Sequence, residues 1–213
     1  MTKFKLLILF LALSLSAYAK DFLKAKLIYT NGKVLNCYAS FFENPYQKEI
    51  RYKLELKSKT QEIKSIELKK IVFYENSDSV EFELITTYRI LSSKPDIPCW
   101  MINLVKGNCK LYLAYSEGYS KFSGVDQFGR MKYNSALDSY MLACIRPNEP
   151  YATIMAVYQK GGLVINANTG FRKAGSEYFR DYPELASKIS SKEYTYKDVE
   201  KVVEIYNDWK SKQ

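Results

Sequence analysis

The chain of 213 residues contains no histidine. This absence excludes Ser-His-Asp and Cys-His nucleophilic systems, imidazole general bases and the common zinc sites, because each of them needs an imidazole. Carboxylate, thiol and lysine chemistry remain available. The Cys-x-x-Cys spacing of zinc and redox sites is also missing. The chain has four cysteines: Cys37, Cys99, Cys109 and Cys144.

Other common signatures are absent as well. We find no internal repeat and no low-complexity segment, and Gly161-Gly162 lacks both the spacing and the lysine of a phosphate-binding loop, so we interpret it as a turn. After the first 19 residues, no segment is apolar enough to cross a bilayer. We therefore expect no cofactor, no metal, no nucleic acid partner and no membrane-spanning segment in the mature chain.

The first 19 residues have the pattern of a secretory signal peptide. Lys3 and Lys5 precede an apolar run over residues 6–15, and Ala17 and Ala19 form a small-x-small cleavage motif. An uncleaved anchor is the alternative, but the apolar run is short for a hydrocarbon core of about 30 Å. We predict cleavage after Ala19 and export to the periplasm or the medium.

The chain is basic, with a formal net charge of +9, and the excess lies in the N-terminal strands. Such an excess can attract a polyanion, such as an acidic glycan or lipid head groups. The alternative is a solvated, lysine-rich face, and the alternation of lysine with glutamate favours it.

An exported chain enters an oxidising space, where its four cysteines can form two disulfides in three connectivities. In the hairpin expected around residues 106–108, Cys99 and Cys109 would lie roughly 17 Å apart at ~3.3 Å per residue, which is beyond bridging reach. Any bridge among the four cysteines should therefore be long-range, and free buried thiols are the open alternative.

Turn signals and apolar alternation predict a series of short strands. Asn31-Gly32 suits a type I′ turn between strands at residues 24–30 and 33–39, and Ile50, Tyr52, Leu54 and Leu56 alternate with charged residues. Further strands are expected at residues 63, 71–74, 80–87, 100–105, 110–115, 140–146 and 151–158, with a helical turn at residues 65–70. The pattern fits mostly antiparallel β-structure, as a small barrel or a bent sheet.

The C-terminal residues predict helices that close this sheet. Asp181 and Pro183 resemble one helix start, with Asp181 as the capping side chain, and Thr195 and Asp198 resemble another. An apolar stripe follows the second start, which a helix must bury against a core. The stripe consists of Val199, Val202, Val203, Tyr206 and Trp209. We thus predict an α+β fold with two to three C-terminal helices, divided into residues 1–19 (leader), 20–94 and 95–213, where the last two parts either stand as sub-domains or pack as one.

Tyrosine is the one residue in clear excess, with 19 copies. One interpretation is an aromatic face for a sugar or a peptide, and the other is the ordinary preference of twisted sheets for half-buried tyrosine. A ligand face would lie where a strand meets the long loop at residues 116–138. Its candidate residues are Tyr112, Tyr115, Tyr119, Phe122, Phe128 and Tyr133.

Two acidic pairs offer weak enzymatic or metal hypotheses. Asp126 and Asp138 lie in the long loop and would suit an acid/base pair, but any loop of this size holds aspartates by chance. Glu81 and Glu83 share a strand face and have lysines nearby, which is ordinary for solvated positions.

Four tracts of the chain carry a resemblance to known proteins: YFRDYPELASKI, KEYTYKDVEKVVEIYNDW, CIRPNEPYATIM and WMINLVKGNCKLYLAYS. They resemble small exported proteins of Bacteroidota that have no assigned activity. The resemblance implies an exported, β-rich protein closed by C-terminal helices, and it implies no chemistry. Our functional hypothesis is therefore a non-catalytic protein that binds a surface component, a glycan or a protein partner. The alternative hypothesis is a carboxylate-dependent hydrolase with an extracytoplasmic substrate.

Overall fold

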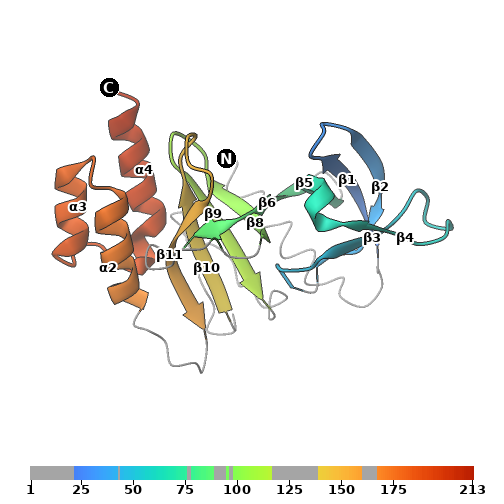
Figure 1. Ribbon diagram of the computed structural model, residues 1–213, viewed down its shortest axis with the longest axis horizontal. Helices are drawn as coiled ribbons and strands as arrows, with labels where there is room; N and C mark the ends of the chain where they lie inside the picture. The colour runs from blue at the N-terminus through green and yellow to red at the C-terminus, as the bar shows by residue number, and fades with distance from the viewer. Residues whose placement is uncertain are drawn as a thin grey trace. The chain divides into compact units, whose positions relative to one another are not determined.

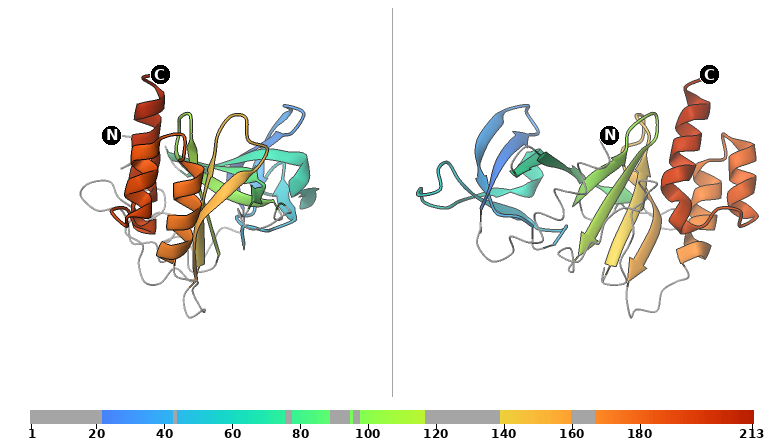
Figure 2. Two further views of the ribbon diagram at one scale, coloured as in Figure 1. Left: turned by 60° about the vertical axis from the view of Figure 1, so that its left-hand side comes forward. Right: turned by 180° about the vertical axis from the view of Figure 1, so that it is seen from behind.

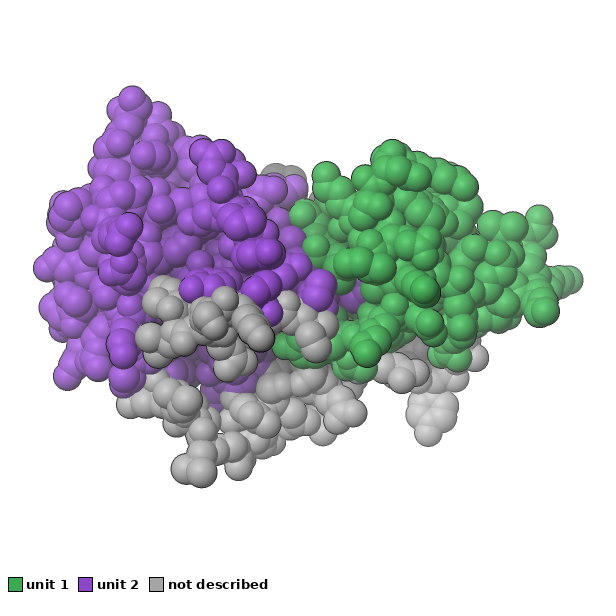
Figure 3. Space-filling view, viewed as in Figure 1, with its two compact units in different colours: residues 1–84, 115–138 green, residues 85–114, 139–213 purple. Residues whose placement is uncertain are grey.

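The computed structural model describes residues 22–42, 44–75, 78–88, 95, 98–116, 139–159 and 167–213. The expected signal peptide, Gly161-Gly162 and most of the loop at residues 116–138 lie outside these ranges. The chain forms two compact units, which are coloured separately in Figure 3. Unit 1 comprises residues 1–84 and 115–138, and unit 2 comprises residues 85–114 and 139–213.

Unit 1 is an antiparallel sheet with the strand order β4-β3-β2-β1-β5-β6 (Figure 1). A single 3-10 turn, η1, connects β4 to β5. The elements are β1 Leu23–Tyr29, β2 Val34–Ala39, β3 Glu49–Lys53, β4 Gln61–Lys64, η1 Ser65–Glu67, β5 Leu68–Glu75 and β6 Asp78–Ile85.

The core of unit 1 is aromatic. Phe73 of β5 and Phe82 of β6 are buried and contact each other at 6.0 Å between ring centroids, and both pack against Phe41 and Phe42 after β2. Most of these rings meet edge to face, which is the favoured geometry for aromatic pairs. The alternation of apolar and charged residues along β5 and β6 is what places these rings on one face.

The first hairpin differs from the prediction in its turn. Gly32 has φ +85° and Asn31 is not in the positive-φ region, so the loop is not type I′. Instead, the Gly32 N–H donates to the Tyr29 carbonyl at 3.0 Å, and the Tyr29 N–H donates to the Lys33 carbonyl at 2.9 Å. This pattern is a type I turn followed by a bulge at glycine, which the extra loop residue allows.

Strand β3 is also shorter than the alternation predicted. It ends at Lys53, and Leu54 and Leu56 are exposed at 50% and 57%. The partner strand β4 begins at Gln61, opposite Tyr52, so residues beyond Lys53 have no strand to pair with on that side. Alternation of apolar and charged residues therefore does not extend β3 beyond the point where the four-residue strand β4 ends its pairing.

Unit 2 combines a sheet with three helices (Figures 1 and 2). Its strand order is β8-β9-β10-β11-β7, in which β7 pairs parallel to β11 and the β8–β9 and β10–β11 pairs are antiparallel. Helix α2 contacts β11 and α3, and α4 contacts β8. The elements are β7 Thr87–Tyr88, β8 Cys99–Val105, β9 Lys110–Ser116, β10 Ser139–Ile145, β11 Ala152–Gln159, α2 Ala167–Tyr178, α3 Pro183–Ser190, η3 Tyr196–Asp198 and α4 Val199–Lys210.

The predicted second helix start lies at the turn η3, which leads directly into α4. The Thr195 hydroxyl accepts from the Lys197 N–H, and the Asp198 carboxylate accepts from the Thr195 N–H at 2.9 Å, which together form a capping box on η3. Val199, Val202, Val203 and Tyr206 are buried as expected, whereas Trp209 is half-buried. The predicted α+β class, with mostly antiparallel strands and C-terminal helices, is confirmed.

The start of α3 is only partly as expected. Pro183 occupies the first helical turn, as predicted, but Tyr182 is the N-cap residue and no side chain caps the helix. Asp181 instead accepts hydrogen bonds from Arg146 and Tyr206. An ion pair to a residue far away in the sequence thus replaces the local cap.

Candidate functional site

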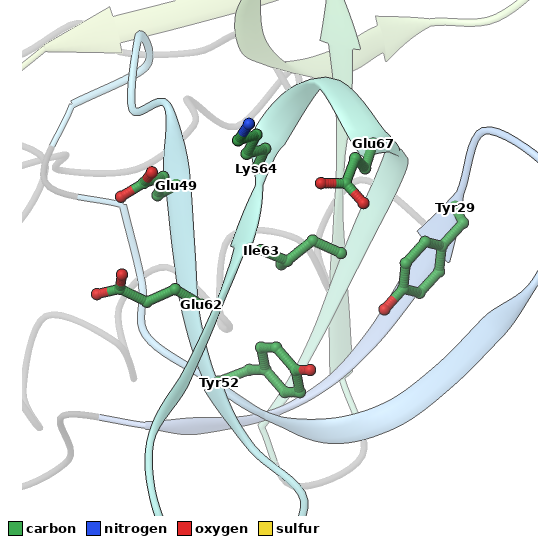
Figure 4. A pocket seen from close by; sticks show the side chains of 7 residues that line it. All are labelled: Tyr29, Glu49, Tyr52, Glu62, Ile63, Lys64 and Glu67. Carbon is green, nitrogen blue, oxygen red and sulfur yellow. The ribbon is translucent and has the colours of Figure 1, made fainter.

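Unit 1 has an open hollow of about 380 Å³. It lies where β3 and β4 meet the end of β1 and the turn η1 (Figure 4). This volume falls within the range of about 300–1,000 Å³ that is usual for small-molecule sites. Its lining residues are Tyr29, Glu49, Tyr52, Glu62, Ile63, Lys64 and Glu67. We call it the Tyr29–Tyr52 pocket.

The β3–β4 register explains why these side chains gather. Ile50 pairs with Ile63 and Tyr52 pairs with Gln61, so Ile50 supports Ile63 from the neighbouring strand. Ile63 is 8% exposed and gives the pocket an apolar floor. The Tyr52 hydroxyl is held at 2.8 Å from Gln61 Oε1 by a hydrogen bond across the two strands. The pairing therefore fixes both the floor and one wall.

The turn η1 is anchored on both sides, which positions Glu67. The Ser65 hydroxyl donates to the Gln47 carbonyl at 2.6 Å, and the Ser65 N–H donates to the Lys48 carbonyl at 2.7 Å. On the other side, the Thr30 N–H donates to the Glu67 carbonyl at 2.9 Å. These backbone bonds connect η1 to β1 and to the start of β3, so the opposite wall is also fixed by main-chain contacts.

The electrostatics of the pocket are acidic. Three glutamates and one lysine line it, whereas the whole chain is basic. Burial raises the pKa of Tyr29, and the nearby Tyr52, Cys37 and Glu67 raise it further. The Tyr29 phenol therefore stays protonated and able to donate a hydrogen bond at neutral pH.

Figure 4 shows how the lining side chains divide. The side chains of Tyr29, Tyr52, Ile63 and Glu67 face a common space, and those of Glu49 and Glu62 extend away from it. The common space thus offers two phenols, one carboxylate and an apolar floor. This set can stack against an apolar ring face and exchange hydrogen bonds with hydroxyl groups.

A second polar cluster lies in unit 2 and is centred on Arg146. Its guanidinium lies between the rings of Tyr178 and Tyr206, at 4.4 Å and 4.8 Å from their centroids. Arg146 Nη2 also donates to the Tyr178 carbonyl at 2.6 Å and to Asp181 Oδ1 at 3.0 Å. We call this set, with Glu149, the Arg146 cluster.

The rings of the Arg146 cluster are themselves hydrogen-bonded. The Tyr178 hydroxyl donates to Glu149 Oε2 at 2.5 Å, and the Tyr206 hydroxyl donates to Asp181 Oδ2 at 2.7 Å. Burial raises the pKa of both tyrosines, and these carboxylates raise it further. Burial alone lowers the pKa of Arg146, but its neighbours outweigh that effect and the pKa is raised, so the guanidinium remains charged. The cluster joins the residue after β10 to α2 and α4, and its carboxylates and hydroxyls bond to members of the cluster, which is the arrangement of a structural network. Of the cluster's side-chain atoms, Arg146 Nε alone is buried without a hydrogen-bond partner among the described residues.

The predicted tyrosine face is not assembled by the described residues. Tyr112 is 1% exposed and packs in the core of unit 2 with Cys99, Met101 and Ala143, so its ring is not available to a ligand. Tyr115 lies in β9, and its side chain is outside the described set. The other candidates, Tyr119, Phe122, Phe128 and Tyr133, lie outside the described ranges, as do Asp126 and Asp138.

Glu81 and Glu83 bind a lysine. Lys70 Nζ lies 2.7 Å from Glu81 Oε2 and 3.6 Å from Glu83 Oε1. The hydrogen bond to Glu81 raises the pKa of Lys70. Within the described ranges, no group of three or more Cys, Asp or Glu side chains is arranged to hold a metal ion.

All four cysteines fall within the described ranges, and all four are buried without a disulfide. Burial raises the pKa of the Cys144 thiol, and the neighbouring Cys109 raises it further.

No family model, curated protein or solved structure matches the chain. In the part of the chain that the structure describes, no helix combines the length and apolar character needed to cross a membrane. No local sequence pattern indicates the Tyr29–Tyr52 pocket, because its walls come from three strands and a turn. Its one local signal is the strand alternation that places Tyr52 on the same face as Ile50.

Proposed function

We propose that the protein is an exported, non-catalytic binding protein whose Tyr29–Tyr52 pocket takes one or two units of a neutral or amine-bearing glycan. The observation that carries the proposal is the convergence of two phenols and the Glu67 carboxylate over the apolar floor of Ile63. A sugar ring has an apolar face and a rim of hydroxyls, and these four groups complement both.

The charge of the pocket favours a neutral or cationic ligand over an acidic one. Glu49, Glu62 and Glu67 outnumber Lys64, so an anionic sugar would meet like charge. This consideration counts against an acidic glycan in the pocket, although the chain as a whole is basic. A protein partner would have to place a cationic side chain at the same position.

Two features support binding over hydrolysis. The three glutamates are exposed, whereas a carboxyl group that acts as a general acid works from a shielded environment. Glu49 and Glu62 also extend away from the space that Glu67 faces, so no carboxyl pair flanks a common bond in Figure 4.

Export is part of the proposal. Cleavage after Ala19 leaves β1 intact, because this strand begins at Leu23. Mass spectrometry of the protein recovered from its host should give a mature N-terminus at Lys20, and a retained leader would contradict export.

The binding test compares the purified mature protein and its variants on immobilised neutral, amino and acidic oligosaccharides. We expect binding to neutral or amino sugars, and a loss of roughly tenfold or more in affinity for Tyr52→Ala and for Glu67→Gln. Tyr151→Ala and Glu55→Gln are matched controls at exposed positions outside the pocket, and they should bind as the parent does.

Three outcomes would overturn the proposal. They are binding to acidic glycans alone, binding to a lysine-rich peptide without any glycan, and release of new reducing ends during incubation. The last outcome would establish the hydrolase alternative, and Glu67→Gln would then abolish the release.

A further inference from the structure

Two of the four cysteines meet in unit 2 although they are far apart in the sequence. Cys109 directly precedes β9, and Cys144 is the next-to-last residue of β10. Strands β9 and β10 are neighbours in the sheet. The neighbouring Cys109 contributes to the raised pKa of Cys144, and both cysteines raise the pKa of Tyr178. The two thiols therefore lie on neighbouring strands, one directly before β9 and the other near the end of β10.

The backbone of Cys109 is held firmly in this position. Its N–H donates to Asn207 Oδ1 at 2.7 Å, and its carbonyl accepts from Asn207 Nδ2 at 2.9 Å. Asn207 belongs to α4, so the last helix fixes the residue from both sides. On the partner strand, Cys144 is held by its pairing with Thr153 of β11. Both cysteines are thus presented by ordered backbone.

We propose that Cys109 and Cys144 form the native disulfide of this protein, which links the start of β9 to the end of β10. The long spacing between them agrees with the expectation that any bridge is long-range. The bond forms by exchange with a small-molecule disulfide such as oxidised glutathione. The two thiols give up two protons and two electrons, an S–S bond forms, and the oxidant leaves as two thiols.

Burial determines when the bond can form. Both residues are 0% exposed, and burial raises the pKa of Cys144 well above its ordinary value. A buried, protonated thiol is a poor nucleophile, so exchange is slow in the folded protein. The bond therefore forms while unit 2 folds and afterwards resists reductants until the unit unfolds.

The disulfide is independent of the proposed glycan site, which lies in unit 1. An exported protein would meet a suitable oxidant, but the test supplies its own oxidant and so does not depend on export. The two proposals can therefore fail separately.

The experiment refolds the mature protein in an oxidised and reduced glutathione mixture, blocks remaining thiols under denaturing conditions, and maps peptides by mass spectrometry without reduction. We expect one linked peptide pair that contains Cys109 and Cys144 and is lost on reduction. The reduced protein should melt roughly 10 °C lower than the oxidised one. The Cys109→Ala/Cys144→Ala variant should melt at the same temperature with or without reductant.

The matched control is Cys37→Ala, which changes a buried cysteine of unit 1 and should leave the linked pair in place. Blocking of all four thiols in the refolded protein would overturn the proposal. A linkage through Cys37 or Cys99 would overturn it as well. Equal melting temperatures of the oxidised and the reduced parent protein would also overturn it.

Discussion

Arg146 and Asp181 form an ion pair across 35 positions of sequence, with 3.0 Å between Arg146 Nη2 and Asp181 Oδ1. The pair connects the residue directly after β10 to the segment between α2 and α3. Tyr206 of α4 completes it by donating to the other carboxylate oxygen of Asp181. The Arg146–Asp181 ion pair thus contributes to the packing of helices α2, α3 and α4 against the sheet of unit 2.

Arg146→Met should lower the free energy of unfolding by about 2 to 4 kcal/mol, because it leaves partly buried acceptors without their donor. Urea denaturation followed by circular dichroism measures this loss. Arg180→Met is the matched control, since the Arg180 side chain is 76% exposed and its ion pair is with the nearby Glu177. The control should change stability by less than about 0.5 kcal/mol. Equal effects of the two variants would show that the Arg146 cluster does not hold the helices.

Trp209→Ala should cost about 1 to 3 kcal/mol, which is less than a fully buried tryptophan would cost. The ring stacks on Tyr182 at 4.5 Å between centroids with 10° between the planes, but it is only half-buried. Thermal melting of unit 2 provides the measurement. Leu56→Ala, at an exposed position in unit 1, is the control and should leave the melting temperature unchanged. An unchanged melting temperature of the Trp209→Ala variant would show that this stack contributes nothing to the packing of α4.

Gly107→Ala should destabilise the protein by about 2 kcal/mol. Gly107 has φ +148°, and a Cβ there would lie 2.6 Å from Asn207 Nδ2, in conflict with the side chain that holds Cys109. Gly170→Ala is the opposite case, because Gly170 lies in α2 with open space around it, and the change should stabilise by about 0.5 to 1 kcal/mol. Chemical denaturation measures the free energy of unfolding of both variants. A Gly107→Ala variant that is as stable as the parent or more stable would contradict the close contact between this turn and Asn207.

The stability of unit 1 should fall between pH 9 and pH 11. Burial raises the pKa of the Cys37 thiol from 9.0 to about 11. Below pH 9 the thiol is protonated in both the folded and the unfolded protein. Between pH 9 and pH 11 it ionises only in the unfolded protein, which therefore binds fewer protons than the folded one. Unfolding becomes more favourable as the pH rises through this range. The loss should be about 1 to 2 kcal/mol.

The comparison for this pH effect is Cys37→Ala, measured by urea denaturation at several pH values. The variant starts from a lower stability because of the cavity, but its decline between pH 9 and pH 11 should be shallower than that of the parent. Parallel curves would show that the thiol is not the titrating group.

Local patterns predicted the parts of this fold that are determined locally. The apolar stripe of α4 repeats every three to four residues, and Thr195 and Asp198 cap the turn η3 that leads into it, so sequence alone located this helix. The predicted strands fall close to the observed ones for the same reason. Each such feature depends on residues less than about ten positions apart.

The features that sequence missed depend on distant partners. Asp181 has the right spacing for a helix cap, yet Arg146 and Tyr206 bind it instead, and no local rule weighs an ion pair across 35 residues. Tyr112 adjoins the long loop in sequence, but its strand position turns it into the core. Similarly, Tyr29 and Glu67 reach one pocket only because η1 folds back on β1.

The hydrogen bonds between Asn207 and the backbone of Cys109 affect when unit 2 can fold during biosynthesis. The residue that secures the turn at Lys106–Cys109 lies about 100 positions later, in the last helix of the chain. Residues through Asn207 must therefore be synthesised before α4 can secure this turn, and contacts of such long range also slow folding. The last step in the packing of unit 2 is consequently the docking of α4, which comes long after its strands β8 and β9 have been made.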